Sequence, residues 1–542
     1  MIREFCMKYK SKINIWYLLF SAMFSAMLIV SGHIFYDPNN NSTVETAFVS
    51  DFHIVDMIGI FLLIPLIYIV MKMVEFCFGA ATTIFYGEKR KKNIWILIGF
   101  WAVILIPWVP YVFSYFPGGI YADTVDSLNM SLKKADLDNH NPILYTMLWR
   151  FVFWITGAFR GKSEYYGLFW FTILQTAVLA FVLAGFVYFC YKKGIHRYFL
   201  CFLLLFFAVF PLYPFYGVAL WKDTPFSMVL FIFAVYLFHV FSNKPEDISK
   251  IQLACYGVFS ILIMFLRNNG IYIALFYSVV IVLMSVKNHR RIALKIGMVS
   301  LFAIAASWII QGPVYDKCGY NITKTVESLG VPIQQTAYIL ATNGNVSSED
   351  LEVLNEIMPL ENWVALYNPV VVDTIKFDPS FNREYFKENV SDFIKVYVGL
   401  VMKNPVKAVK AYMLETLGFW NVFESSSTAY ICNVNFGNVP YYQGDYFDYF
   451  FGISFRNLVE PKTYISAAVF AWMMLATISI CLAKRYYVGI IPVLPTLGLW
   501  LSIMVAAPVA FSFRYVYAVF LCVPLYLLIC MKAVHNEKVI EN

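Results

Sequence analysis

Long apolar segments, separated by shorter polar ones, recur from the start of the sequence to its end. Because a helix needs about 20 mostly apolar residues to cross a bilayer, each of these segments predicts a membrane-spanning helix. The pattern therefore predicts an all-α polytopic membrane protein with about twelve spans. The predicted spans are residues 14–34, 54–75, 94–114, 166–190, 197–213, 223–241, 250–266, 271–286, 292–311, 462–482, 487–506 and 513–531.

The connections between these segments alternate in charge. Every second connection carries Lys or Arg, whereas residues 35–53, the first connection on the other side, contain neither. Basic connections stay in the cytoplasm. The alternation therefore predicts a protein of the plasma membrane with both termini on its cytoplasmic side. The basic connections contain Arg3, Lys8, Lys10 and Lys12; Lys89 and Arg90 with Lys91 and Lys92; Lys192, Lys193 and Arg197; Lys244 and Lys250; Lys287, Arg290, Arg291 and Lys295; Lys484 and Arg485; and Lys532 and Lys538.

Two long segments do not fit a span and are expected on the outer side. Residues 115–165 contain an apolar run, Ile143 to Phe159, which Arg150 interrupts, and this predicts a helix in the membrane interface. Residues 312–460 are long enough to fold as a separate, mostly α-helical domain. That segment holds 17 of the 34 acidic residues and 10 of the 41 basic ones. Its acidity gives no sign of nucleic-acid binding.

The chain is thus expected to have four parts. Residues 1–93 supply two N-terminal spans, and residues 94–311 form a transmembrane module that carries the external loop 115–165. Residues 312–460 form the extracytoplasmic domain, and residues 461–542 supply the last spans. Composition agrees with this division, because 60% of the residues are hydrophobic and 14% are charged, whereas soluble domains carry about 25% charged residues.

The ten cysteines show neither a CxxC pair nor a spacing typical of a metal site. Most of them fall inside predicted spans, where Cys behaves as a small apolar residue. Cys318 and Cys432 fall in the large external segment. An oxidising compartment would allow these two to pair, although their spacing alone does not decide it.

The densest group of polar residues lies in the first large external loop. Asp123 and Asp126 are three residues apart, so on a helix they would share one face. In one interpretation Asp123 is a helix N-cap and Asp126 its third-position partner. In another, Asp123 accepts a proton from an attacking hydroxyl, or both carboxylates hold a divalent metal, Mg²⁺ or Mn²⁺. His140, just before Pro142, is either a helix-start residue or part of the same site.

Basic residues are rare in the predicted external turns, so Lys222, Arg267 and Arg514 stand out. Each either anchors a helix end to lipid headgroups or, together with Tyr515, contributes to a phosphate site. An arginine side chain suits such a site because it can donate two parallel hydrogen bonds to a phosphate. Asp223 follows Lys222 directly. The two side chains either neutralise each other, with the lysine reaching to the interface, or Asp223 faces inward as a functional group.

Four short motifs of the external loops occur together in the sequence. They are Phe116-Pro-Gly-Gly, Tyr121-Ala-Asp123-Thr-Val-Asp126-Ser, Asp138-Asn-His140-Asn-Pro142 and Trp221-Lys222-Asp223. Together they resemble the GT-C superfamily of membrane glycosyltransferases, which includes protein O-mannosyltransferases and aminoarabinose transferases. Within it, the chain is similar to poorly characterised polytopic proteins of Gram-positive bacteria. The resemblance covers roughly residues 94–340 and the last spans.

The resemblance implies a transferase that moves a sugar, with inversion, from a polyprenyl-phosphate donor to an extracytoplasmic acceptor. The acceptor would be a cell-envelope glycopolymer, a lipid or a protein. The resemblance further implies that Asp123 acts as general base or metal neighbour, with Asp126 close by and Asp223 as a second acidic residue. His140, Tyr515 and the three external cations would bind substrate. The chain departs from the commoner pattern in its two extra N-terminal spans and in the position of its external domain.

Three other classes of protein compete with this interpretation: a transporter or flippase, a membrane acyltransferase or polymer ligase, and a non-catalytic cell-envelope protein. A transporter or flippase of envelope precursors would carry polar residues near the middle of its spans. Here the polar residues crowd the external ends of the spans, which favours an enzyme at the membrane surface. A membrane acyltransferase or polymer ligase would use similar external carboxylates or a histidine.

Overall fold

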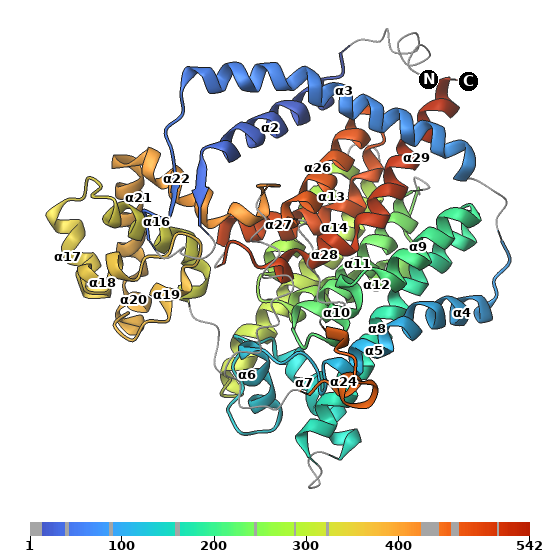
Figure 1. The fold of residues 1–542 in the computed structure, drawn as a ribbon, viewed down its shortest axis with the longest axis horizontal. Coiled ribbons are helices and arrows are strands. Elements are labelled where there is room, and N and C mark those ends of the chain that lie inside the picture. The colour runs from blue at the N-terminus through green and yellow to red at the C-terminus, as the bar shows by residue number, and fades with distance from the viewer. Residues whose placement is uncertain are drawn as a thin grey trace.

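The protein folds into a helical bundle with a smaller lobe at one end, as seen in a computed structural model (Figure 1). The described residues are 77% helical and contain a single two-stranded sheet, β1 (Ile34–Tyr36) with β2 (Ala47–Val49). The expected all-α membrane class is therefore confirmed. The structure describes residues 13–37, 43–85, 90–157, 163–242, 246–286, 289–320, 325–423, 444–456, 466–506 and 509–541.

Apolar helices build the bundle. Several of them begin at polar capping residues, such as Asn14 before α2 and Ser249, which forms a capping box with Gln252 before α12. The bundle helices are α2 (Ile15–Gly32), α3 (Ile54–Phe85), α4 (Ile94–Leu105), α5 (Val109–Ser114), α8 (Glu164–Lys192), α9 (Arg197–Val209), α10 (Leu212–Val218), α11 (Asp223–Phe241), α12 (Lys250–Leu266), α13 (Gly270–Val286), α14 (Arg290–Ile309), α26 (Ala467–Ala483), α27 (Leu494–Ala506), α28 (Tyr517–Leu521) and α29 (Val523–Glu541).

Eight helical segments in the described parts of the chain are long and apolar enough to cross a membrane, or nine if α9 and α10, bent by 48°, form one span. The protein is thus a multi-pass membrane protein. Every predicted span falls on a helix or on consecutive helical segments. However, α12, α13 and α26 have 17 residues each, which gives a length of about 26 Å. The count of twelve therefore stays a prediction. Of the basic residues that suggested the topology, Arg3, Lys8, Lys10, Lys12, Lys89, Lys244 and Lys287 lie outside the described residues.

The two N-terminal helices lie side by side along one edge of the bundle (Figure 1). Helix α2 packs against α3 and α26, and α3 packs against α29. A buried carboxylate joins them to the rest, because Glu75 of α3 pairs with Lys72 at 3.2 Å and with Lys484 at the end of α26. This ion-paired cluster offsets the cost of placing Glu75, which is 4% exposed, inside the protein.

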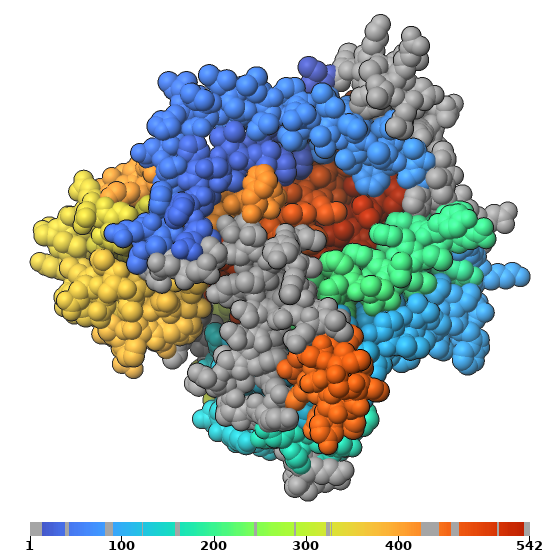
Figure 2. All heavy atoms as spheres, in the orientation of Figure 1, coloured from blue at the N-terminus to red at the C-terminus, as the bar shows by residue number. Residues whose placement is uncertain are grey.

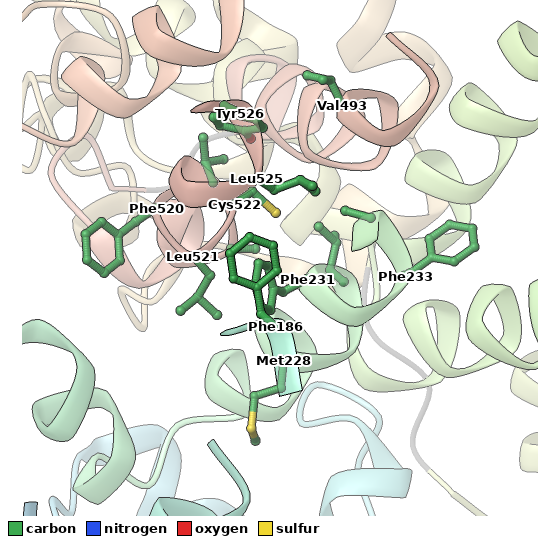
Figure 3. Close-up of a cluster of buried hydrophobic side chains, with 14 of the residues drawn as sticks. Phe186, Met228, Phe231, Phe233, Val493, Phe520, Leu521, Cys522, Leu525 and Tyr526 are labelled. Carbon is green, nitrogen blue, oxygen red and sulfur yellow. The ribbon is translucent and has the colours of Figure 1, made fainter. Parts of the chain in front are cut away.

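Helix α11 lies at the centre of the bundle and packs against α12, α28 and the segment before α27. Phe231 and Phe233 of α11 belong to one cluster of buried side chains with Phe520 and Leu525 of the C-terminal helices, part of which Figure 3 shows. All four of these side chains are at most 1% exposed. This packing fixes α11, and with it the position of the first residues of that helix, where the candidate site lies.

Residues 325–423 form a lobe of their own, which stands at one end of the molecule in the space-filling view (Figure 2). Its core surrounds the fully buried Trp363 and includes Val49 from β2. The lobe consists of α16 (Gly330–Ala341), α17 (Ser348–Ile357), α18 (Leu360–Ala365), α19 (Asp373–Lys376), α20 (Arg383–Glu388), α21 (Val390–Lys403) and α22 (Pro405–Glu415).

The segment expected at the membrane interface contains α6 (Ala122–Ser131) and α7 (Ile143–Thr156). Helix α7 buries Trp149 and Phe153 against its neighbours but exposes Phe151 and Trp154. This two-sided character suits an interfacial helix. In the other predicted external segment, Cys318 is exposed. Cys432 lies outside the described residues, so the pairing of these cysteines stays a prediction.

Candidate functional site

Asp123 is positioned by a loop that runs beside the segment preceding α11. The backbone N–H of Gly119 donates to Val218 O over 2.8 Å, and Leu220 N–H donates back to Gly119 O over 2.9 Å. The hydroxyl of Thr124 adds a third bond, to Leu220 O, over 2.9 Å. These bonds hold the first turn of α6 against the start of α11, so Asp123 lies beside residues about a hundred positions further along the chain.

Asp123 forms ion pairs with two cations. Arg514 Nη1 donates to Asp123 Oδ2 over 2.8 Å, and Lys222 Nζ lies 3.9 Å from the same oxygen. Burial raises the pKa of Asp123, but Arg514 and Lys222 more than offset this and hold that pKa well below its usual range. The N-cap of α6 is Tyr121, and Asp123 follows in the first turn. The interpretation of Asp123 as a helix N-cap is therefore wrong.

Lys222 and Asp223 do not neutralise each other. Lys222 Nζ donates to Asn141 Oδ1 over 2.9 Å and to His140 O over 3.3 Å. Asp223 pairs instead with Arg267, whose Nη1 donates to Asp223 Oδ1 over 2.7 Å. Because Asp223 is 2% exposed and Arg267 is 13% exposed, this is a buried ion pair. The inward orientation proposed for Asp223 is thus observed.

A tight turn between α12 and α13 places Arg267. A side chain at Gly270 would put its Cβ 2.3 Å from Ile263 O, so only glycine allows the two backbones to approach this closely. Arg267 and Arg514 both lie over the ring of Tyr515, each guanidinium 5.1 Å from the ring centroid. The aromatic ring holds the two like charges in one small region by cation–π contacts.

The site residues line one cavity of about 980 Å³. Its wall combines the polar cluster with apolar side chains of α13 and α27. Three residues of the lobe complete the wall. Asp126 does not line the cavity; it is exposed one helical turn beyond Asp123. The predicted residues that the structure brings together are Asp123, His140, Lys222, Asp223, Arg267, Arg514 and Tyr515; the apolar wall includes Tyr272, Phe276, Leu501, Ile503 and Val505, and the lobe side contributes Ser328, Asp373 and Phe377.

Residues 130–541 match the model of a family that is described as a family of unknown function, DUF6020. The chain belongs to this family. The DUF6020 match starts after Asp123 but includes Lys222, Arg267 and Arg514. Neither a curated protein nor a solved structure matches this DUF6020 chain. Its resemblance to GT-C glycosyltransferases therefore remains an expectation.

The residues expected to hold a divalent metal in this DUF6020 protein do not fit one. Asp126 lies outside the cavity, and Asp123 Oδ2 already faces Arg514 and Lys222. No three His, Cys, Asp or Glu side chains come together as a metal site anywhere in the described ranges. The cavity instead presents three cations, an arrangement that favours an anionic ligand.

Sequence reasoning missed several residues of the site in this DUF6020 member. Asn269 lies in the same turn as Arg267 and lines the cavity, as does Ser502 of α27. Asp373 and Phe377 belong to the lobe. The turn sequence Arg267-Asn-Asn-Gly did indicate Asn269, because burying two amide side chains at the end of a span costs free energy unless they are hydrogen-bonded. Ser502, inside an apolar run, offered none.

Proposed function

We propose that this protein is a GT-C-type glycosyltransferase that moves a sugar from a polyprenyl-phosphate donor to an extracytoplasmic acceptor. The acceptor would be an envelope glycopolymer, a lipid or a protein. The observation that supports this most is the meeting of Asp123 and Asp223 with three cations in a cavity that has an apolar wall. A lipid-linked sugar phosphate needs these features together: cations for its phosphate, an apolar surface for its chain and a carboxylate for proton transfer.

In the proposed reaction, Arg267, Arg514 and Lys222 bind the donor phosphate and stabilise the charge that grows on it as it leaves. An acceptor hydroxyl attacks the anomeric carbon from the face opposite the phosphate, so the new carbon–oxygen bond forms as the bond to phosphate oxygen breaks. Asp123 takes the hydroxyl proton. Polyprenyl phosphate then leaves, and the sugar has changed its anomeric configuration.

The ion pairs of Asp123 set the order of two steps in this scheme: the donor binds before Asp123 takes the proton. While Arg514 and Lys222 pair with Asp123, they hold its pKa low, and a carboxylate with a low pKa is a weak base. A donor phosphate that shares these cations adds negative charge beside Asp123 and raises that pKa. Asp123 thus becomes a stronger base once the donor is bound.

Purified protein with a sugar-charged polyprenyl phosphate tests the proposal directly. Release of free polyprenyl phosphate that depends on an added acceptor is the expected result. If vesicles containing the protein instead carry the intact lipid between leaflets without releasing polyprenyl phosphate, the protein is a flippase and the proposal is wrong. Transfer of an acyl group, with the glycosidic phosphate left intact, would point to a membrane acyltransferase or ligase.

Replacing Arg514 by Gln is expected to weaken binding of polyprenyl phosphate by about 10–100-fold. A charge-assisted hydrogen bond is worth about 1.5–3 kcal/mol, which corresponds to that range. Scintillation proximity binding of labelled polyprenyl phosphate to the purified variant measures it. Arg291→Gln is the control, because Arg291 is exposed at the start of α14. Equal binding by Arg514→Gln and Arg291→Gln would remove Arg514 from the phosphate site.

We also propose that the chain spans a bacterial plasma membrane twelve times, with both termini in the cytoplasm and the cavity facing outward. The alternating basic connections support this orientation. Under it, the lobe and the external ends of α11 and α13 lie on the same side as the sugar acceptor. The polyprenyl chain would lie along the apolar wall formed by α13 and α27.

The exposed Cys318 allows the orientation to be tested. In intact cells of a strain that expresses a Cys432→Ser variant, a membrane-impermeant maleimide is expected to label the protein from outside. Adding Cys318→Ser is expected to abolish that label, because the other cysteines of the described residues lie in bundle helices. Labelling of Cys318 only after the membrane has been opened would place the lobe in the cytoplasm.

A further inference from the structure

Two hydrogen-bond acceptors in the cavity have no partner. Asp223 Oδ2 and Asn269 Oδ1 are buried, and no donor among the described residues reaches either atom. Both residues line the cavity. Buried polar atoms are nearly always hydrogen-bonded in folded proteins, since leaving one unpaired costs free energy. Both atoms belong to residues of one cavity, where a ligand with donor groups would supply the missing partners.

The orientation of Asn269 is fixed by its neighbours. Its Nδ2 donates to Ser502 Oγ over 2.8 Å, and Ser502 Oγ donates in turn to Leu499 O over 2.7 Å. If the amide were reversed, its oxygen would face a hydroxyl whose proton is already used. Asn269 Oδ1 is therefore the atom that remains for a ligand.

The geometry of Asp223 leads to the same conclusion. Its Oδ1 accepts from Arg267, which holds the carboxylate in place. Its Oδ2 is left as a second acceptor, on a side chain that is 2% exposed. A phosphate group cannot satisfy either atom, because an ionised phosphate brings acceptors and no donor. The group that occupies this part of the cavity must carry hydroxyl or similar donors.

We infer that Asn269 and Asp223 form a subsite for the hydroxyl groups of a sugar, next to the phosphate-binding cations. This inference rests on the proposed function, and it adds Asn269 as a residue that determines which sugar is bound. Ser502 acts through Asn269 as a positioning residue. The hydroxyl groups belong either to the donor sugar or to the acceptor, and both present the same chemistry to these two oxygens.

The subsite explains how the cavity distinguishes ligands. A site whose buried polar groups are satisfied by a ligand hydroxyl rejects an otherwise similar ligand without it. A polyprenyl phosphate with no sugar would leave both oxygens unpaired, whereas a sugar-charged lipid would satisfy them. Losing one of the two acceptors should then weaken binding of the charged lipid alone.

The test measures binding to the purified full-length protein and to its Asn269→Leu variant. The probes are bare polyprenyl phosphate, the same lipid charged in turn with glucose, galactose, mannose or N-acetylglucosamine, and soluble oligosaccharides of these sugars. We expect Asn269→Leu to bind the bare lipid as the wild type does, which shows that it folds. It should bind at least one charged lipid or oligosaccharide about 10–100-fold more weakly.

The pattern of results separates the alternatives. A loss for a charged lipid assigns the subsite to the donor sugar, and a loss for an oligosaccharide assigns it to the acceptor. Equal affinity of both proteins for every sugar-bearing probe, or an equal loss for the bare lipid, overturns the inference. If the wild type never cleaves a charged lipid but Asn269→Leu still binds it more weakly, the proposed function fails while the subsite stands. Ser502→Ala should reproduce part of the Asn269→Leu loss.

Discussion

Replacing Asp123 by Asn is expected to lower the rate of sugar transfer about 10²–10⁴-fold, the contribution of a positioned general base. Asn keeps the size of the side chain and still accepts a hydrogen bond from Arg514, so the loop should stay in place. The variant loses the negative charge and with it the ability to take a proton. The measurement is the initial rate of polyprenyl-phosphate release at saturating donor and acceptor, with donor affinity determined in parallel.

Two other carboxylates serve as controls for this variant. Asp136 is exposed in the same loop, and Asp126 is exposed outside the cavity. Asp136→Asn and Asp126→Asn should each change the rate by less than about tenfold. If Asp123→Asn turns over as fast as the wild type, Asp123 is not the base. If Asp126→Asn shows the larger loss, the roles of the two residues are reversed.

The low pKa of Asp123 also predicts how acid affects the protein without donor. A depressed carboxyl pKa adds stability at pH values above the ordinary carboxyl range, and this stability is lost as pH falls through the lower, folded value. The Asp123–Arg514 pair should therefore persist at pH values near 4, where an ordinary aspartate is half protonated.

Replacing Arg267 by Gln is expected to destabilise the protein by about 3–5 kcal/mol, because it leaves the buried carboxylate of Asp223 without its cation. The double variant Asp223→Asn with Arg267→Gln removes both charges and should recover much of that loss. Unfolding of the purified proteins in detergent by increasing denaturant, followed by intrinsic fluorescence, gives the difference in free energy of unfolding.

An exposed ion pair in the same bundle provides the comparison. Lys295 Nζ lies 2.7 Å from Asp247 Oδ1, with the side chains 35% and 51% exposed. Lys295→Gln should cost no more than about 1 kcal/mol, since solvent screens such pairs. An Arg267→Gln variant that loses no more stability than Lys295→Gln would show that Asp223 is reached by solvent. A double variant less stable than Arg267→Gln alone would also show that solvent reaches Asp223.

The helices were predictable because backbone N–H and C=O groups inside a bilayer must be hydrogen-bonded within the protein, which a helix achieves by itself. A segment such as α8, apolar over most of its length, has few alternatives to a spanning helix. The number of spans was harder to predict. Helices α12, α13 and α26 are apolar but short, and hydropathy does not say whether a short helix crosses the bilayer when its neighbours cover it.

The three cations of the cavity were predictable for a related reason. Charged side chains at the ends of spans are costly, so Lys222, Arg267 and Arg514 stood out against their apolar surroundings. Their pairing was not predictable, because adjacency in sequence suggested Lys222 with Asp223, whereas the fold joins Asp223 to Arg267. Pairings between distant turns depend on how helices pack, which no local pattern records.

The contact between Asp123 and Arg514 joins positions 391 residues apart. During synthesis, the N-terminal partner leaves the ribosome long before the C-terminal one exists. Until then Lys222 is the one cation of the described pair partners that Asp123 can meet, and the Arg514 contact forms only when the last helices fold against the others. Chains that stop early would display an incomplete cavity with no closing arginine.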